Sequence, residues 1–255
     1  MKFIDTHAHL YDEAFAGEED MAVGRAIDAG VTKLIFPDID SQTRGAMFAF
    51  ADRHEGVIFP CLGLHPTSVD AGWEKELLDM EGYLSRHICA IGEIGMDCYW
   101  SKEFLKEQQE VLRIQLEMAA RLDLPVIIHS RDSTELIINI LKECRHLSLR
   151  GVFHAFSGSR ETFRELQRLG DWYIGIGGVL TYKKASIAET VRDIPSERIL
   201  LETDSPYLTP VPYRGKRNES SYIPLIAARL AELTGRDMAE IAETTTDNAQ
   251  KLFRI

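Results

Sequence analysis

The sequence predicts a TIM barrel, the (β/α)8 arrangement of the α/β class, from three observations. Short apolar runs alternate eight times with longer amphipathic stretches. Histidines and carboxylates of interest follow the apolar runs, as catalytic groups follow barrel strands. The length of 255 residues and the 45% hydrophobic content suit one such barrel. A doubly wound open sheet is the alternative. Because no linker or short-period repeat divides the chain, we expect residues 1–255 to form one domain.

The first half of the chain contains four of the expected strands. An apolar run at 3–10 predicts the first strand, and an amphipathic stretch at 18–29, closed by Gly30, predicts the first helix. The same patterns predict strands at 32–37, 57–64 and 88–94, with helices at 42–54 and 74–86 between them. The third and fourth strands lead into glycine-containing exits at 63–66 and 92–97.

The second half continues the alternation. A helix is expected at 103–122 because its apolar residues recur at helical spacing. The fifth strand is expected at 125–131, and Asp132 or Ser133 is placed to cap a helix that runs to 144. Further strands are predicted at 151–154, 173–179 and 198–203, with helices at 160–169 and 185–192. Two helices, at 223–234 and 238–253, close the chain.

Charge and composition limit the classes of function. The net charge of −11 excludes a broad basic surface for duplex nucleic acid, although a local basic groove remains possible because bound metal can neutralise acids. Lys2 and Asp5 interrupt any apolar signal region, and no stretch has the length of a membrane span. We therefore expect a cytoplasmic protein without membrane association, a monomer or weak oligomer. The cysteines, which form no C-x-x-C pair, are expected to be reduced thiols: Cys61, Cys89, Cys98 and Cys144.

Two histidines in the first strand are the first sign of a metal site. His7 and His9 are separated by one residue, so on a strand both imidazoles point to one face. Imidazole is a preferred ligand of zinc and other first-row divalent ions, whereas hydrogen-bonded histidines at a barrel end are the alternative. Later expected strands end in further candidates, namely His65, Glu93, His129, His154 and Asp204. The carboxyl ends of barrel strands meet on one face, so these side chains should converge.

The number of candidate ligands exceeds what one ion needs. Four histidines, at 7, 9, 129 and 154, and two carboxylates predict two ions, with Glu93 bridging them because Gly92 and Gly95 leave room around it. Magnesium, manganese and zinc all stay open. The remaining histidines lie at helix ends and are interpreted as structural or surface residues: His54, His87 and His146.

Six motifs along the chain resemble the TatD family of metal-dependent deoxyribonucleases. They are DTHAHL at 5–10, GLHP at 63–66, GEIGMD at 92–97, HSR at 129–131, HAFSG at 154–158 and ETDSPYL at 202–208. Two positions depart from the family pattern. One is Ala155, where cysteine is more frequent. The other is Ser220-Ser221, where a proline often follows the glutamate, here Glu219. Neither is a proposed ligand, so the departures concern loop shape and substrate preference.

The resemblance implies a TIM-barrel phosphodiesterase that degrades DNA from a 3′ end. By motif, one ion would be held by His7, His9, Glu93 and Asp204, and the second by Glu93, His129 and His154. His65 and Arg131 would contact the substrate phosphate. DNA against RNA as the substrate stays open.

A basic run follows the eighth expected strand. Arg214, Lys216 and Arg217 lie at 209–218 with Tyr213 among them, which favours phosphate contact and base stacking. A solvated loop is the alternative. Lys183 and Lys184, after the seventh strand, could extend this groove.

Our hypothesis from the sequence is two-metal hydrolysis of phosphodiester bonds. The ions would lower the pKa of a shared water, and His65 and Arg131 would neutralise charge on the phosphate. Asp204 would ligate and could accept the proton of the water, and Glu202 would orient a ligand or water. An amidohydrolase-type enzyme acting on a cyclic amide, ester or phosphotriester is the first alternative, although such sites often use a modified lysine where this chain has Glu93. A nucleic-acid or metal-binding protein without turnover is the second.

Overall fold

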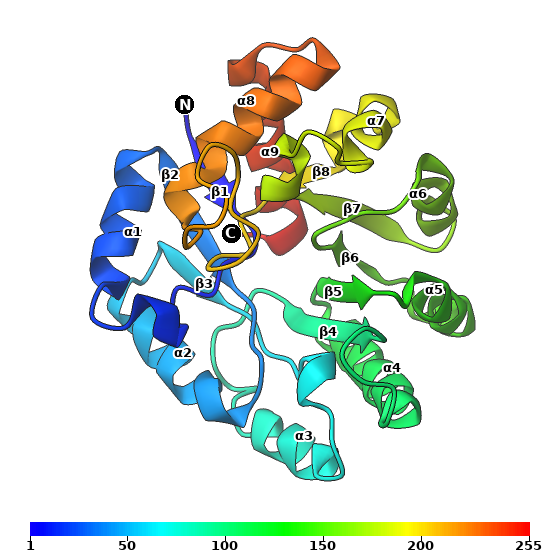
Figure 1. Cartoon of the computed structure of the whole chain (residues 1–255). Helices are drawn as coiled ribbons and strands as arrows, with labels where there is room; N and C mark the ends of the chain where they lie inside the picture. Colours follow the sequence, from blue (N-terminus) through cyan, green and yellow to red (C-terminus); the bar gives the residue numbers. More distant parts are fainter.

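Eight parallel strands form a barrel in the computed structural model, which describes residues 1–255 (Figure 1). The strands are β1 (Phe3–Asp5), β2 (Val31–Phe36), β3 (Ile58–Pro60), β4 (Ile91–Asp97), β5 (Val126–Arg131), β6 (Arg150–Phe153), β7 (Asp171–Ile176) and β8 (Ile199–Leu201). β1 to β3 pair in sequence order, and so do β4 to β8. Two seams separate these groups of strands, and each is closed by a single β-bridge: Ala8 with Ser205, and Leu62 with Ile91. The predicted TIM barrel is confirmed.

Helices surround the strands (Figure 1). They are α1 (Glu19–Asp28), α2 (Ser41–Arg53), α3 (Trp73–Glu81), α4 (Leu105–Leu122), α5 (Thr134–Glu143), α6 (Arg160–Gln167), α7 (Ile187–Thr190), α8 (Ile223–Thr234) and α9 (Met238–Phe253). Asp40 and Asp237 cap α2 and α9 by accepting hydrogen bonds from backbone N–H groups of the first turn. Ser133 precedes α5 as predicted, but its hydroxyl donates to the carbonyl oxygen of Met96 instead of capping.

The last helix covers the end of the barrel at which the strands begin. Leu252 and Phe253 of α9 pack in one hydrophobic cluster with strand residues that include Ile4, Ile127 and Leu200. Burial of this apolar face ties the C-terminal helix to the barrel. The opposite end, to which the carboxyl ends of the strands lead, is where a functional site can form.

Several expected elements are shorter in the structure. β1 ends at Asp5 instead of residue 10, and β3 covers Ile58–Pro60 instead of 57–64. The segment after β1 forms hydrogen bonds alternately with its two neighbouring strands. The N–H of Thr6 donates to the carbonyl oxygen of Leu201 in β8, and that of Ala8 donates to the carbonyl oxygen of Ile35 in β2. A continuous ladder is therefore lost although the backbone groups are paired. β7 spans 171–176 instead of 173–179 because 178–181 forms a 3-10 helix, and α7 is reduced to four residues.

The four cysteines are free, as predicted, and all four are buried. No helix combines the length and the apolar character that a membrane crossing requires.

A fully buried arginine connects α2 with the loop that carries His65. Arg44 donates from Nε to Asp38 Oδ2 at 2.7 Å and from Nη2 to the carbonyl oxygen of Gly63 at 3.3 Å. Asp38 Oδ2 also accepts from the N–H of Gly63 at 3.1 Å, and Asp79 pairs with Nη1 of the arginine. The guanidinium and the Asp38 carboxylate are both 0% exposed. Each charge therefore depends on the other for its compensation.

Replacing this arginine should destabilise the protein strongly. In Arg44→Met, the free energy of unfolding in urea should fall by about 3–5 kcal/mol because the Asp38 carboxylate stays buried without its partner. Arg53→Ala on the same helix is the control, since its side chain is 55% exposed, and should change the free energy by less than about 0.5 kcal/mol. Equal small losses in both variants would contradict this assignment.

Candidate metal centre

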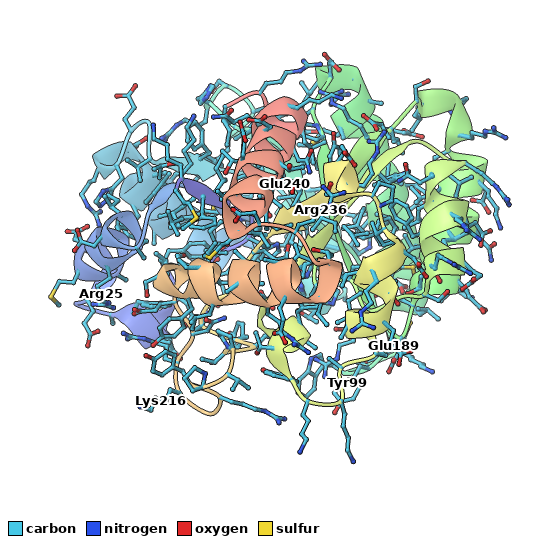
Figure 2. All side chains as sticks on the ribbon, turned by 90° about the horizontal axis from the view of Figure 1, so that it is seen from above. Arg25, Tyr99, Glu189, Lys216, Arg236 and Glu240 are labelled. Carbon is cyan, nitrogen blue, oxygen red and sulfur yellow. The ribbon has the colours of Figure 1, made fainter.

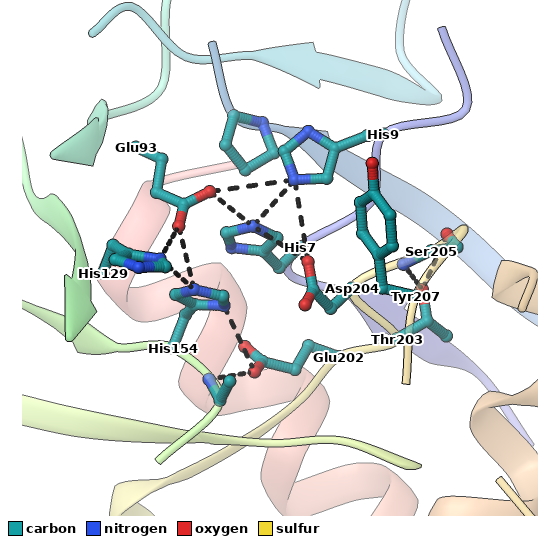
Figure 3. Close-up of polar contacts among 12 residues, drawn as sticks. His7, His9, Glu93, His129, His154, Glu202, Thr203, Asp204, Ser205 and Tyr207 are labelled. Carbon is teal, nitrogen blue, oxygen red and sulfur yellow. Dashed lines mark hydrogen bonds and ion pairs between the residues drawn. The ribbon is translucent and has the colours of Figure 1, made fainter. Parts of the chain in front are cut away.

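The six ligands predicted from the sequence lie together at the carboxyl ends of the strands. His7 and His9 follow β1, Glu93 lies in β4 and His129 in β5. His154 follows β6 directly, and Asp204 lies in the loop after β8. Figure 3 shows these side chains pointing toward one another. The alternation of strands and loops thus brings together residues that are as far apart in the sequence as 7 and 204.

Glu93 stands at the centre of this group, with its side chain only 3% exposed. Its Oε2 lies 3.0 Å from Nε2 of His7 and 3.7 Å from Nε2 of His9. Its Oε1 lies 2.7 Å from Nδ1 of His129, 2.9 Å from Nε2 of His154 and 3.3 Å from Nε2 of His65. The two carboxylate oxygens therefore face two different sets of imidazoles, as a bridging ligand requires.

The set of side chains facing Oε2 is completed by Asp204. Its Oδ1 lies 3.6 Å from Nε2 of His7 and 3.7 Å from Nε2 of His9, and these two nitrogens are 3.0 Å apart. The hydroxyl of Tyr11 donates to the carbonyl oxygen of Pro37 and lies 2.8 Å from Nδ1 of His9. An N–H at Nδ1 can then donate to the tyrosine oxygen, which leaves the lone pair of Nε2 directed at the centre.

His129 is held in the set facing Oε1 by a residue that was not predicted. Its Nε2 lies 3.0 Å from Oδ2 of Asp97, while its Nδ1 faces Glu93 and lies 3.3 Å from Nε2 of His65. Burial would raise the pKa of Asp97, but the hydrogen bond with His129 and those from the N–H groups of Trp100 and Tyr99 keep it low, at about 2. The ionised carboxylate accepts from His129 and so directs the other ring nitrogen inward.

Asp97 should be needed for tight metal binding. Asp97→Asn retains an acceptor for the two backbone N–H groups but removes the charge that orients His129, so metal affinity should fall by about 10- to 100-fold. Asp132→Asn is the matched control, because Asp132 is an exposed carboxylate beyond β5. Competition with a fluorescent chelator measures both affinities. Parent-like affinity in Asp97→Asn would contradict the role.

The two glycines of β4 were predicted to leave room around Glu93, but in the structure they leave room for β5. A Cβ on Gly95, where φ is 144°, would lie 2.0 Å from the carbonyl oxygen of His129, and one on Gly92 would lie 2.6 Å from Cβ of Ile127. Both glycines therefore face β5 and let the two strands approach closely. This approach is what brings Glu93 and His129 into contact.

Glu202 lies behind His154 instead of at the centre. It is fully buried, its Oε1 accepts from the N–H of Ala155, and the same oxygen lies 3.7 Å from Nδ1 of the histidine. Burial raises the pKa of Glu202 to about 8, although the histidine opposes the shift. Gly175 leaves the space, because a Cβ there would lie 2.0 Å from Oε2 of Glu202. The position fits the predicted task of orienting a ligand.

Charges at the centre favour a bound cation. Burial would lower the pKa of His154, but the adjacent Glu93 carboxylate raises it to about 10. Burial raises the pKa of Asp204 to about 7, with His154 opposing and Glu93 adding to the shift. A divalent cation would compensate these carboxylates and replace protons on the imidazoles.

The donor set also fits such ions chemically. In three groups of side chains, each residue offers one ligand atom, and the atoms of a group lie within 4.8 Å of one another. The groups are His7, His9 and Asp204; His7, His154 and Glu202; and His65, Glu93 and His129. Imidazole nitrogen and carboxylate oxygen are the donors that first-row divalent ions prefer. His65, predicted to contact phosphate, thus lies among the candidate ligands.

The other residues predicted to contact substrate lie outside this centre. The guanidinium of Arg214 stacks on Tyr182 at 4.5 Å, and the ammonium of Lys216 lies 5.8 Å from the ring of Tyr213. Arg131 is exposed at the end of β5. Asn218 anchors the loop by donating to the carbonyl oxygens of Thr203 and Tyr207, on either side of Asp204.

Arg217 is engaged within the protein. It donates to Glu18 Oε2 and to the carbonyl oxygen of Ala14, each at 2.7 Å, and stacks on Phe15. Of the three basic residues predicted for substrate binding in this loop, it is therefore the least available to a ligand.

An apolar cavity of about 80 Å³ adjoins the carboxylates. Phe156, Leu180 and Leu208 line it together with Glu202 and Asp204. This apolar wall contributes to the burial that raises the pKa of both acids.

Comparisons with known proteins agree with the geometry. The model of the family described as TatD related DNase matches residues 4–254. The uncharacterized metal-dependent hydrolase YabD of Bacillus subtilis is 39% identical, with 98% of each chain covered. The crystal structure of YjjV, a TatD homologue from Escherichia coli, superposes with a TM-score of 0.90 at 31% identity and covers 99% of this chain and 98% of its own. The Escherichia fergusonii protein named 3′-5′ ssDNA/RNA exonuclease TatD is 33% identical, again over 98% of each chain.

Proposed function

Because the chain belongs to the TatD-related DNase family of metal-dependent hydrolases, we propose that it is a two-metal nuclease that degrades single-stranded DNA from the 3′ end. The observation that carries the proposal is the position of Glu93, whose two oxygens face separate sets of imidazoles. A relative of 33% identity is named a 3′-5′ exonuclease of single-stranded DNA and RNA, which supports the same substrate class and direction here.

The chain offers ligands for two ions. His7, His9 and Asp204 would hold one ion with Oε2 of Glu93, whereas His129, His154 and His65 would hold the second with Oε1. Bound divalent ions would polarise the scissile phosphate and lower the pKa of the attacking water.

Proton transfer falls to Asp204. Its side chain is 15% exposed whereas that of His7 is fully buried, so a water molecule can reach the carboxylate. Its Oδ1 faces His7 and His9, which leaves Oδ2 to accept a proton from the attacking water. Glu202 would keep His154 in place, and Arg131 would hold the phosphate through its guanidinium.

The assay that tests the function uses end-labelled linear DNA, linear RNA and closed circular single-stranded DNA, each with chelator or with added Mg²⁺, Mn²⁺ or Zn²⁺. We expect linear DNA to shorten progressively from its 3′ end with release of mononucleotides, only with metal, and the circle to resist. Rapid cutting of the circle would contradict the end-directed activity. Hydrolysis of cyclic amides or lactones without nuclease activity would favour an amidohydrolase instead.

The basic loop should contribute phosphate contacts. In Arg214→Ala/Lys216→Ala, binding should weaken, and the slope of log affinity against log salt concentration should decrease by about 1.4, or about 0.7 for each lost contact to a single strand. Arg217→Ala is the matched control, since its guanidinium is held by Glu18. Equal slopes for the double variant and the parent would show that the loop is merely solvated.

A further inference from the structure

Two exposed aromatic residues follow β4 at the mouth of the barrel. Tyr99 is 55% and Trp100 70% exposed, although large aromatic side chains are usually well buried. Their rings meet edge to face, with centroids 5.0 Å apart. Figure 2 places Tyr99 at the same end of the molecule as Lys216 of the basic loop. The aromatic pair therefore lies on the side of the barrel to which a substrate would bind.

The pair is fixed relative to the metal centre. Oδ1 of Asp97 accepts from the N–H groups of Tyr99 at 2.9 Å and of Trp100 at 3.1 Å. The other oxygen of this buried carboxylate lies 3.0 Å from His129, which in turn lies 2.7 Å from Glu93. Three successive polar contacts thus join the backbone of Trp100 to the central carboxylate. Such a connection holds the backbone that carries the aromatic pair at a fixed place relative to the central carboxylate.

Arg131 supplies a positive charge at the same place. Arg131, at the end of β5, lies opposite Asp97 of β4 in the strand register. Its guanidinium carbon lies 3.8 Å from the ring centroid of Tyr99 and 5.3 Å from that of Trp100. The side chain of Arg131 is exposed and its guanidinium lies over the aromatic pair, where an anion can reach it. Since it covers Tyr99 while Trp100 is 70% exposed, the tryptophan offers the more open ring surface.

We propose that Trp100 is a stacking surface for a nucleobase of the substrate strand, while Arg131 contacts the adjoining phosphate. The inference rests on the proposed function, because it takes the substrate to be a nucleic acid. A nucleotide carries an aromatic face and an anion at adjacent positions, and the pair of Trp100 and Arg131 presents the complementary groups in the same way. Stacking of this kind tolerates any base, as a degradative nuclease requires.

Affinities for two strands test the stacking directly. One is a single-stranded DNA with phosphorothioate linkages, which resist hydrolysis, and the other is identical but lacks the bases near its 3′ end. Fluorescence anisotropy should show that the parent protein prefers the complete strand by about tenfold. Trp100→Ala should lose this preference, and Trp100→Phe should retain most of it. Leu78→Ala, which alters a 69% exposed residue on α3, is the control and should keep the full preference.

Each outcome decides between the inference and its rivals. An equal preference in the parent and in Trp100→Ala would overturn the stacking role, and so would binding of neither strand. A change confined to self-association, measured by sedimentation, would assign the aromatic pair to a protein interface instead. Turnover is measured separately on ordinary DNA. If the parent prefers the complete strand through Trp100 but hydrolyses no DNA, this inference stands and the nuclease is refuted. If the protein hydrolyses DNA but Trp100→Ala keeps the preference, the nuclease stands and this inference is refuted.

Discussion

Glu93→Ala should abolish hydrolysis and remove most of the bound metal. Because the two oxygens of this carboxylate face two sets of imidazoles, its loss would affect both ions of the proposed centre at once. A bound divalent ion would stabilise the charge of the transition state by several kcal/mol, so the rate should fall on the order of 10³-fold or more. Steady-state kinetics and elemental analysis of the purified variant measure the two effects.

Two other variants sharpen this test. His7→Ala affects only one of the sets and should lose less metal than Glu93→Ala. Glu189→Ala alters an exposed carboxylate on α7 that is not a candidate ligand, and it should retain parent activity and metal content. Undiminished metal in both Glu93→Ala and His7→Ala would contradict the assignment of the centre.

Asp204→Asn should lower kcat by about 10²- to 10⁴-fold, the usual contribution of a general base. The amide oxygen can still ligate, and His7, His9 and Glu93 remain, so most of the metal should stay bound. Metal loss in proportion to the loss of rate would show that Asp204 is only a ligand.

Glu202→Gln is the comparison for Asp204→Asn. Its oxygen contacts the backbone of Ala155 and the far side of His154, so we expect a smaller loss of kcat. A larger loss than in Asp204→Asn would instead make Glu202 the group that accepts the proton.

That the candidate ligands lie together could be predicted from the sequence, because the carboxyl ends of barrel strands meet on one face. His7, Glu93 and Asp204 are distant in sequence. His7 and Asp204 each follow a strand and Glu93 lies within one, and the carboxyl ends of these strands converge. Asp97 could have been found in the same way, since alternation along β4 places it on the same face as Glu93. Tyr11 gave no such signal, because its contact with His9 depends on the course of a loop.

Individual hydrogen bonds between loop residues far apart in the sequence could not be predicted. Arg217 lies in a basic run, and only the fold shows that Glu18 and Ala14, about 200 positions earlier, engage its guanidinium. The length of β1 was overestimated for a related reason. A strand at a barrel seam can pair irregularly with both neighbours, and neither hydrophobicity nor spacing reports that pattern.

The most direct test of the central claim is a metal titration of the chelator-treated protein, with hydrolysis of end-labelled linear single-stranded DNA as the readout and bound metal measured by elemental analysis. Since Glu93 connects two sets of ligands, we predict that hydrolysis stays low while the first equivalent binds and rises as the second binds. Full hydrolysis at one equivalent per chain, or none at any loading, would contradict the account.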